Sequence, residues 1–200
     1  TLPVKASAGI LKISALIYAL YFCSSMRSFS SIYPELGKAR ARPKTIYIQN
    51  RHNFIISDQS INGGNAACIT LVDCYNVRIT RNKLYNSTDV GILLYDCKGI
   101  YINNNFFSNL STGVYAERSD GGAIQVDHNQ FLNMRGPYPR GQFVQFNKIN
   151  GPDNLICYNR CENLPAKSNP EDGISLYKCH GTQKSRIIIK GNWIRGGGPS

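Results

Sequence analysis

Charged side chains are scarce in this chain: they make up 18% of its 200 residues, and only 12 are acidic against 23 basic. Low charge with many Asn, Gly, Ser and Tyr suits an exported β protein better than a cytosolic enzyme. No apolar run approaches the roughly 20 residues that a membrane-spanning helix needs, since the longest, residues 10–22, has 13. The three histidines, His52, His128 and His180, show neither H-E-x-x-H nor triad spacing, which excludes the common zinc-protease signature.

Apolar residues at helical spacing are also missing, and short alternating segments take their place. Residues 91–109, GILLYDCKGIYINNNFFSN, contain two such segments joined at Lys98-Gly99. The same template recurs six times. The first strands are expected at 46–48, 69–71, 92–94, 114–116, 143–145 and 174–176, with starts 23, 23, 22, 29 and 31 residues apart. The second strands are expected at 54–56, 77–79, 100–102, 124–126, 155–156 and 187–189.

A polar residue follows each second strand, and an apolar residue usually comes two positions later. The polar position is occupied by Gln59, Asn82, Asn105, Asn129, Asn159 and Asn192. Repeats of 20–30 residues with β-branched strands are typical of a β-solenoid, whose coils stack about 4.8 Å apart. Equivalent amides would then hydrogen-bond one another along the stack, so we assign these Asn residues to the scaffold rather than to an active site.

The repeats GIYINNNFF and GAIQVDHNQF resemble those of right-handed parallel β-helices in the pectate-lyase-like superfamily, over about residues 44–194. The segments RGQFVQFNK (140–148), NPEDGISLYK (169–178) and GNWIRGGGPS (191–200) resemble a group of secreted bacterial β-helix proteins. The resemblance implies an all-β, right-handed parallel β-helix of about six coils.

Three regions are expected along the chain. Residues 1–25 match a secretory signal peptide, with Lys5 and Lys12 around a short apolar segment, although a buried capping helix is the alternative. Residues 26–45 read as a basic linker or N-terminal cap. Residues 46–200 form the β-helix, and we expect it to be incomplete at its C-terminus because the sequence stops after a second strand. These features predict a protein that is secreted, periplasmic or on the cell surface.

The charge distribution narrows the choice of partner. Residues 52–200 hold 15 basic and 11 acidic side chains, so the repeats are only mildly basic. Nucleic acid would need a denser basic stripe and a recognised module. An acidic polysaccharide is the expected partner, and we expect a monomer.

Cysteines recur in register with the repeats. Cys74, Cys97 and Cys179 fall just after the first strand of their coils. Neighbouring coils would place Cys74 and Cys97 within disulfide range, but a ladder of free thiols fits equally well. The spacing of Cys157, Cys161 and His180 does not favour a zinc site.

The last coils are longer, through insertions at 132–141 and 162–172 that are rich in Pro, Gly and polar residues. Stacking would bring these two loops side by side, beside the outer face of the first strands. The resemblance implies that a polysaccharide lies along that face. Alternation and position predict a substrate-binding set of Tyr95, Glu117, Arg118, Phe146, Tyr177, Lys178 and Arg195.

Cleavage of a uronate by β-elimination needs a cation at the carboxylate, a base and an acid. The candidate catalytic residues are Arg140, Lys148, Glu171 and Asp172. Calcium is the candidate cofactor, with Glu117, Glu171 and Asp172 as its oxygen ligands. The predicted function is therefore a carbohydrate-active β-helix and candidate polysaccharide lyase. A non-catalytic glycan-binding or adhesion β-helix is the alternative. Glycoside hydrolysis by a carboxylate pair is a third hypothesis, although polygalacturonase-type N-T-D and G-H-G motifs are absent.

Overall fold

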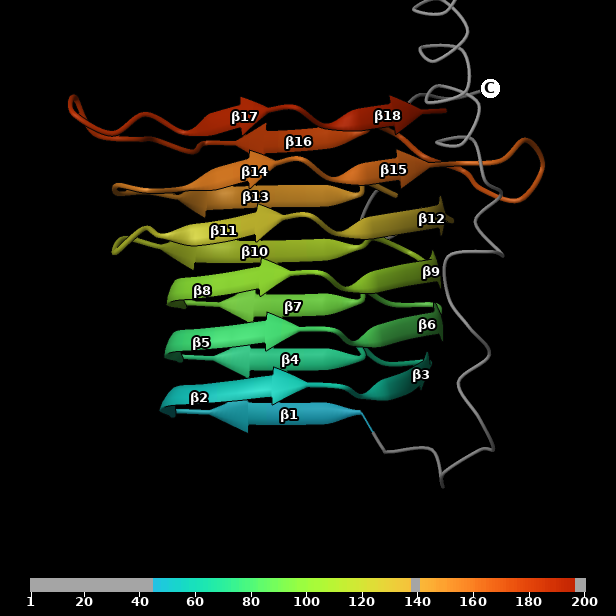
Figure 1. Cartoon of the computed structure of the whole chain (residues 1–200), viewed down its shortest axis with the longest axis horizontal. Helices are drawn as coiled ribbons and strands as arrows, with labels where there is room; N and C mark the ends of the chain where they lie inside the picture. Colours follow the sequence, from blue (N-terminus) through green and yellow to red (C-terminus); the bar gives the residue numbers. More distant parts are fainter. Residues whose placement is uncertain (1–44, 138–140, 197–200) are drawn as a thin grey trace, which may run out of the picture. The chain divides into compact units, whose positions relative to one another are not determined.

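The computed structural model describes residues 45–137 and 141–196, and strands of three parallel sheets account for most of them (Figure 1). The first sheet has the order β1-β4-β7-β10-β13-β16, the second β17-β14-β11-β8-β5-β2 and the third β18-β15-β12-β9-β6-β3. Each coil contributes one strand to each sheet, so successive strands along the chain never pair with each other. The described ranges contain no helix. The predicted right-handed parallel β-helix of about six coils is confirmed.

The strands are short and their bounds repeat from coil to coil. The first sheet consists of β1 (Ile46–Gln49), β4 (Ile69–Val72), β7 (Ile92–Tyr95), β10 (Val114–Ser119), β13 (Val144–Ile149) and β16 (Ile174–Tyr177). The second consists of β2 (His52–Ser57), β5 (Tyr75–Thr80), β8 (Lys98–Asn103), β11 (Ile124–Asp127), β14 (Leu155–Cys157) and β17 (Ile188–Lys190). The third consists of β3 (Ser60–Gly64), β6 (Lys83–Ser87), β9 (Phe106–Leu110), β12 (Gln130–Met134), β15 (Arg160–Glu162) and β18 (Trp193–Arg195).

The sequence predicted two strands per coil, and the third strand was missed. It holds the apolar residue that follows the ladder position, such as Phe107 in β9 and Phe131 in β12. The two rings stack in the core of the β-helix, with centroids 4.5 Å apart and an interplanar angle of 13°. The third sheet, which carries these residues, encloses the core together with the other two sheets. Inward side chains such as Leu71 and Ile92 are therefore fully buried.

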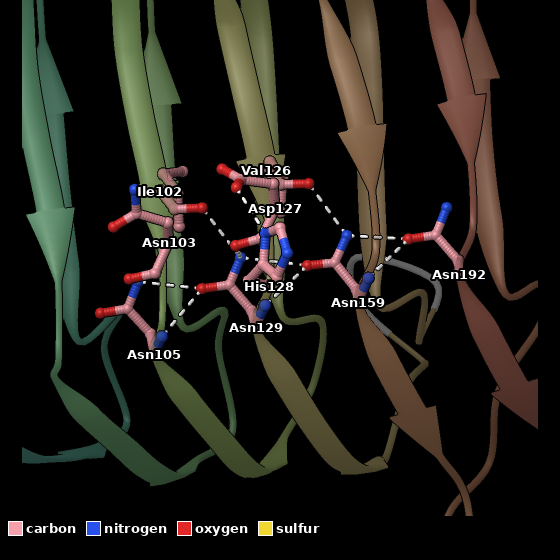
Figure 2. A network of polar contacts seen from close by, with 9 residues as sticks. All are labelled: Ile102, Asn103, Asn105, Val126, Asp127, His128, Asn129, Asn159 and Asn192. Atoms are coloured by element: carbon pink, nitrogen blue, oxygen red, sulfur yellow. Dashed lines mark hydrogen bonds and ion pairs between the residues drawn. The ribbon is translucent and has the colours of Figure 1, made fainter.

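The Asn ladder runs along one corner of the stack, and Figure 2 shows it from Asn105 to Asn192. The Nδ2 of Asn105 donates to Asn129 Oδ1 at 3.0 Å, and Asn129 Nδ2 donates to Asn159 Oδ1 at 3.1 Å. The same oxygens accept backbone N–H groups, and each Nδ2 also donates to a carbonyl of the coil before, as Asn105 does to Ile79 O at 2.9 Å. Asn82 and Asn159 continue the pattern and are nearly completely buried. The structural role predicted for these residues is confirmed.

The predicted register of the fifth coil was wrong by one residue. Val114 pairs with Val144, not with Phe143, and Val144 pairs with Ile174. Both Phe143 and Val144 are apolar and buried, so the alternation alone did not show which of them begins the strand. A shift of one residue turns every following side chain to the other face of the sheet. This change matters for the site described below.

The two long loops lie side by side, as predicted. The N–H of Asn169 in the second loop donates to Met134 O in the first at 3.1 Å. Gly136 and Gly141 both have positive φ, and a Cβ on either would lie within 2.8 Å of Asn169 O. Further insertions were not predicted. They lie between the first and second sheets, at residues 150–154 and 178–187. The predicted signal peptide and most of the predicted linker lie in residues 1–44, outside the described residues.

The cysteines of the described ranges are free thiols. Cys97 donates from Sγ to the carbonyl oxygens of Leu71 and Tyr95, each at 3.4 Å, and Cys74 donates to Val72 O at 3.3 Å. The structure therefore favours the thiol ladder over the Cys74–Cys97 disulfide. Burial raises the pKa of the Cys97 thiol to about 11 and that of Cys68 to about 12.

Replacement of a ladder residue is expected to destabilise the whole stack. Asn105→Ala removes the acceptor of the Asn82 N–H and the donor to Ile79 O, and leaves both groups buried. We expect a loss of about 3 kcal/mol in the free energy of unfolding, measured by chemical denaturation. Asn104→Gly is the matched control, because Asn104 is exposed and already has a positive φ. An equal loss in both variants would contradict the structural role of the ladder.

The buried thiols predict a dependence of stability on alkaline pH. The pKa of Cys97 is higher in the folded state than in the unfolded state, so its contribution to stability is complete below about pH 9 and falls as pH rises toward about 11. Denaturation measured at about pH 8 and about pH 10.5 should show a smaller pH-dependent loss in Cys97→Ala than in the wild type. Identical pH profiles would show that this thiol does not ionise on unfolding.

Candidate functional site

The outer face of the first sheet carries two rows of side chains that run along the stack. One row consists of Tyr47, Thr70, Leu93, Tyr115, Gln145 and Ser175, and the other of Gln49, Val72, Tyr95, Glu117, Asn147 and Tyr177. Most are partly exposed, and Tyr177 is 52% exposed. Hydroxyl, amide, carboxylate and aromatic groups thus repeat at the strand spacing of about 4.8 Å.

A third row lies at the corner that follows the first strands, and its charge changes sign along the stack. It consists of Asn50, Asp73, Asp96, Arg118, Lys148 and Lys178, all with φ between 51° and 56°. Asn and Asp adopt this left-handed conformation readily, whereas Arg and Lys do so rarely. The last three coils therefore present three cations on successive strands, and we refer to Arg118, Lys148 and Lys178 as the cation row.

Arg118 is held in place by the coil before it. Its Nε and Nη2 donate to the two carboxylate oxygens of Asp96 at 3.1 and 2.9 Å, and its Nη1 donates to Tyr95 Oη at 2.6 Å. The guanidinium carbon lies 4.8 Å from the centroid of the Tyr95 ring. Asp96 and then Tyr95 raise the pKa of Arg118 above its ordinary value. Arg118 is thus a fixed cation and not a candidate base.

Lys148 and Lys178 are exposed, and neither forms an ion pair with another described residue. Lys178 Nζ lies 5.2 Å from the centroid of the Tyr177 ring. Two ammonium groups without a carboxylate partner, placed next to the Arg118 guanidinium, repel one another and favour a bound anion.

A polar network lies beside the cation row. Asn147 Nδ2 donates to Tyr115 Oη at 3.1 Å, and the Tyr115 hydroxyl lies 3.5 Å from Glu117 Oε2, toward which it donates. Gln145 Oε1 and Asn147 Oδ1 are buried, and no donor to either is found among the described residues. Because these two oxygens are buried, a ligand would reach them only if the side chains move. Gln145 was missed from the sequence, and the corrected register places Gln145 and Asn147 on this face, whereas alternation had already predicted an outward position for Tyr115.

Phe146 was wrongly predicted to bind substrate. It occupies an inward position of β13 and is completely buried in the core, because the strand begins at Val144. Asn147 takes the outward position predicted for Phe146, and Lys148 follows it at the corner. The same correction moves Lys148 into line with Arg118 and Lys178.

The other predicted residues are only partly brought together. Tyr95, Glu117, Arg118, Lys148, Tyr177 and Lys178 share the first-sheet face and its corner. Arg195 lies on β18 in the third sheet, where its Nη1 donates to Glu162 Oε1 at 3.1 Å, so it does not belong to this face. Arg140 lies outside the described residues. Glu171 and Asp172 are exposed at the end of the second long loop, just before β16.

The carboxylates predicted to bind calcium do not form a metal centre. In residues 45–137 and 141–196, no group of three or more His, Cys, Asp or Glu side chains could hold a metal ion. Glu117, Glu171 and Asp172 therefore do not assemble into the expected ligand set, and we derive no step through calcium.

Comparison with known proteins identifies the architecture. A family model described as "Right handed beta helix region" matches residues 25–142, more than half of the chain. No curated protein and no solved structure matches it. Among the described residues there is no helix of the length and apolarity required to cross a membrane.

The corrected register can be tested by comparing the two aromatic residues of this region. Phe146→Ala should lower the free energy of unfolding by about 3–5 kcal/mol, because it leaves a cavity in the core. Tyr177→Ala, on the exposed face, should change it by no more than about 0.5 kcal/mol. Chemical denaturation of both variants checks this. A small effect of Phe146→Ala would restore the outward position that the sequence suggested.

Proposed function

The chain belongs to the right-handed beta-helix family, and on that basis we propose that it binds an acidic, uronate-containing polysaccharide along the outer face of the first sheet and cleaves it by β-elimination. The observation that carries the proposal is the cation row. Arg118, Lys148 and Lys178 stand on successive coils beside Tyr95 and Tyr177. A polyanion laid along the stack would meet one cation per coil.

The aromatic and polar groups of the face support a carbohydrate as that polyanion. Tyr177 offers an exposed ring surface on which a sugar ring can stack, and Lys178 Nζ lies over the same ring, 5.2 Å from its centroid. The amide oxygens of Gln145 and Asn147 have no donor among the described residues, and a sugar hydroxyl would supply one once these buried side chains turn outward. Nucleic acid remains disfavoured, because the cations form a single short row and not a broad basic patch.

The same arrangement favours elimination over hydrolysis. Arg118 is a permanent cation, and the two N–H groups of its guanidinium that do not donate to Asp96 or Tyr95 would donate to the uronate carboxylate and stabilise the charge that develops when the C5 proton leaves. Lys148, one coil further, is our candidate base; it would accept the C5 proton only as the neutral amine, and it becomes an ammonium group when it does so. The C4–O bond then breaks, a C4–C5 double bond forms, and solvent protonates the leaving oxygen. Hydrolysis would require two carboxylates that face each other across the glycosidic bond. The two outward rows of the first sheet contain one acidic residue, Glu117.

Export is part of this proposal and rests on the sequence of residues 1–25. A polysaccharide of this kind is an extracellular substrate, which fits a secreted, periplasmic or cell-surface protein.

The proposal predicts that the two lysines carry binding. The double variant Lys148→Gln/Lys178→Gln should bind polygalacturonate roughly tenfold more weakly than the wild type, and its affinity should depend less on salt. Titration calorimetry at two salt concentrations measures both effects. Lys83→Gln is the matched control, because Lys83 is an exposed cation on the third sheet.

The products distinguish the reaction. Unsaturated uronate ends, detected by their ultraviolet absorbance, would support elimination, and their loss in Lys148→Gln with binding retained would support the role of Lys148. New reducing ends without unsaturation would indicate a hydrolase. Binding without any product would leave the non-catalytic glycan-binding protein. Failure of the wild type to bind any of a panel of uronate polysaccharides would overturn the proposal.

A further inference from the structure

A second surface with unpaired positive charge lies on a different sheet. The outer face of the second sheet has a hollow of about 340 Å³ over β2, β5 and β8, at the opposite end of the stack from the cation row. It is lined by Asn53, Phe54, Ile55, Asn76, Val77, Arg78 and Tyr101. Its volume is in the range of small-ligand sites, and none of the seven lining residues is acidic.

The outward row of this sheet gives the hollow its apolar and cationic groups. Ile55, Arg78 and Tyr101 are paired in register on successive coils. Ile55 is 65% exposed, which is unusual for so large an apolar side chain. The guanidinium carbon of Arg78 lies 5.9 Å from the centroid of the Tyr101 ring. No carboxylate pairs with Arg78 among the described residues, in contrast to Arg81 and Arg118, which both have an Asp partner.

The neighbouring corner adds amides, a second cation and a ring. Asn76 Nδ2 donates to Asn53 Oδ1, so the two amides hold each other at the edge of the hollow. Beside them, the rings of His52 and Tyr75 stack with centroids 4.5 Å apart, and Lys98 Nζ lies 5.7 Å from the Tyr75 ring. Arg78 thus places a positive charge in a hollow with an apolar surface, and Lys98 lies at the neighbouring corner without lining the hollow.

We propose that this hollow is a second carbohydrate-binding site, which takes a carboxylate-bearing sugar residue. The carboxylate would pair with the Arg78 guanidinium, whose parallel N–H groups match its two oxygens. The apolar face of the sugar ring would lie on Ile55 and Tyr101, and its hydroxyls would reach the amides of Asn53 and Asn76. The ligand class is the one in the proposed function, but the residues belong to a different sheet.

Two sites on the same β-helix would bind a long acidic glycan more tightly than either site alone. Once one site is occupied, the second meets its ligand at a high effective concentration. The hollow would therefore contribute to affinity for a polymer far more than to affinity for a short oligosaccharide.

The test uses trigalacturonate and polygalacturonate with the full chain. Titration calorimetry of the wild type with trigalacturonate should show two sites. Arg78→Gln/Tyr101→Ala should weaken binding at one site roughly tenfold and leave the other unchanged. The matched control is Gln125→Ala, since Gln125 pairs in register with Tyr101 on the next coil but does not line the hollow. Thermal unfolding of each variant checks that the fold is retained, and Arg78→Lys, which keeps charge but not the fork of donors, should be intermediate.

The two lysines of the cation row separate this inference from the proposed function. In the Lys148→Gln/Lys178→Gln variant, trigalacturonate should keep its wild-type affinity at one site, and the further changes Arg78→Gln and Tyr101→Ala should weaken binding at that site roughly tenfold. If Arg78→Gln removes all binding from an otherwise wild-type chain, the hollow is the site and the first-sheet proposal fails. If trigalacturonate binds with the same stoichiometry and affinity with and without Arg78→Gln/Tyr101→Ala, the hollow is not a binding site.

Discussion

Every part of this structure depends on the stacking of coils in register. A core side chain in the middle of the stack is covered by equivalent side chains above and below it. Ile156 in β14 has described coils on both sides and is completely buried, whereas Ile189, at the same position in the last described coil, is 49% exposed. The Asn ladder adds direction to this stacking, because each amide bonds to both neighbouring coils and tolerates no shift by one residue. Hydrophobic burial thus supplies the stability, and the ladder supplies the register.

Stacking also determines the form that a functional site takes in this fold. A residue at one position of the repeat meets its equivalents every 4.8 Å or so, so surface chemistry is arranged in rows along the axis. A row of one charge is unfavourable for the isolated protein, and the fold offsets this at Arg81 and Arg118 with an Asp on the coil before. Lys148, Lys178 and Arg78 have no such Asp partner among the described residues. Cations of this kind are suited to bind an elongated anionic ligand.

The sequence predicted those features that repeat strictly and failed where a local choice was ambiguous. Alternating Ile, Leu and Val identified the first two strands, and the recurring Asn identified the ladder. The third strand was missed because polar residues interrupt its alternation, as Ser108 and Asn109 do between the buried residues Phe107 and Leu110 of β9. At Phe143-Val144 two neighbouring apolar residues are both buried, and alternation cannot choose between them. Register then had to come from the pairing of β13 with β10 and β16, which sequence alone does not give. The hollow around Arg78 depends on side-chain positions across three coils and has no sequence signature.

The backbone conformation of the corner row bears on which residues act. A left-handed residue other than Gly, Asn or Asp costs about 1–2 kcal/mol, so stability alone favours Asn or Asp, as at Asn50, Asp73 and Asp96. Arg81 shows that an ion pair can compensate for this cost, and Arg118 has the same compensation from Asp96. Lys148 and Lys178 have the same strained backbone without such a pair. In the proposed function, an anion bound by these two lysines would take the place that Asp58 and Asp96 have beside Arg81 and Arg118.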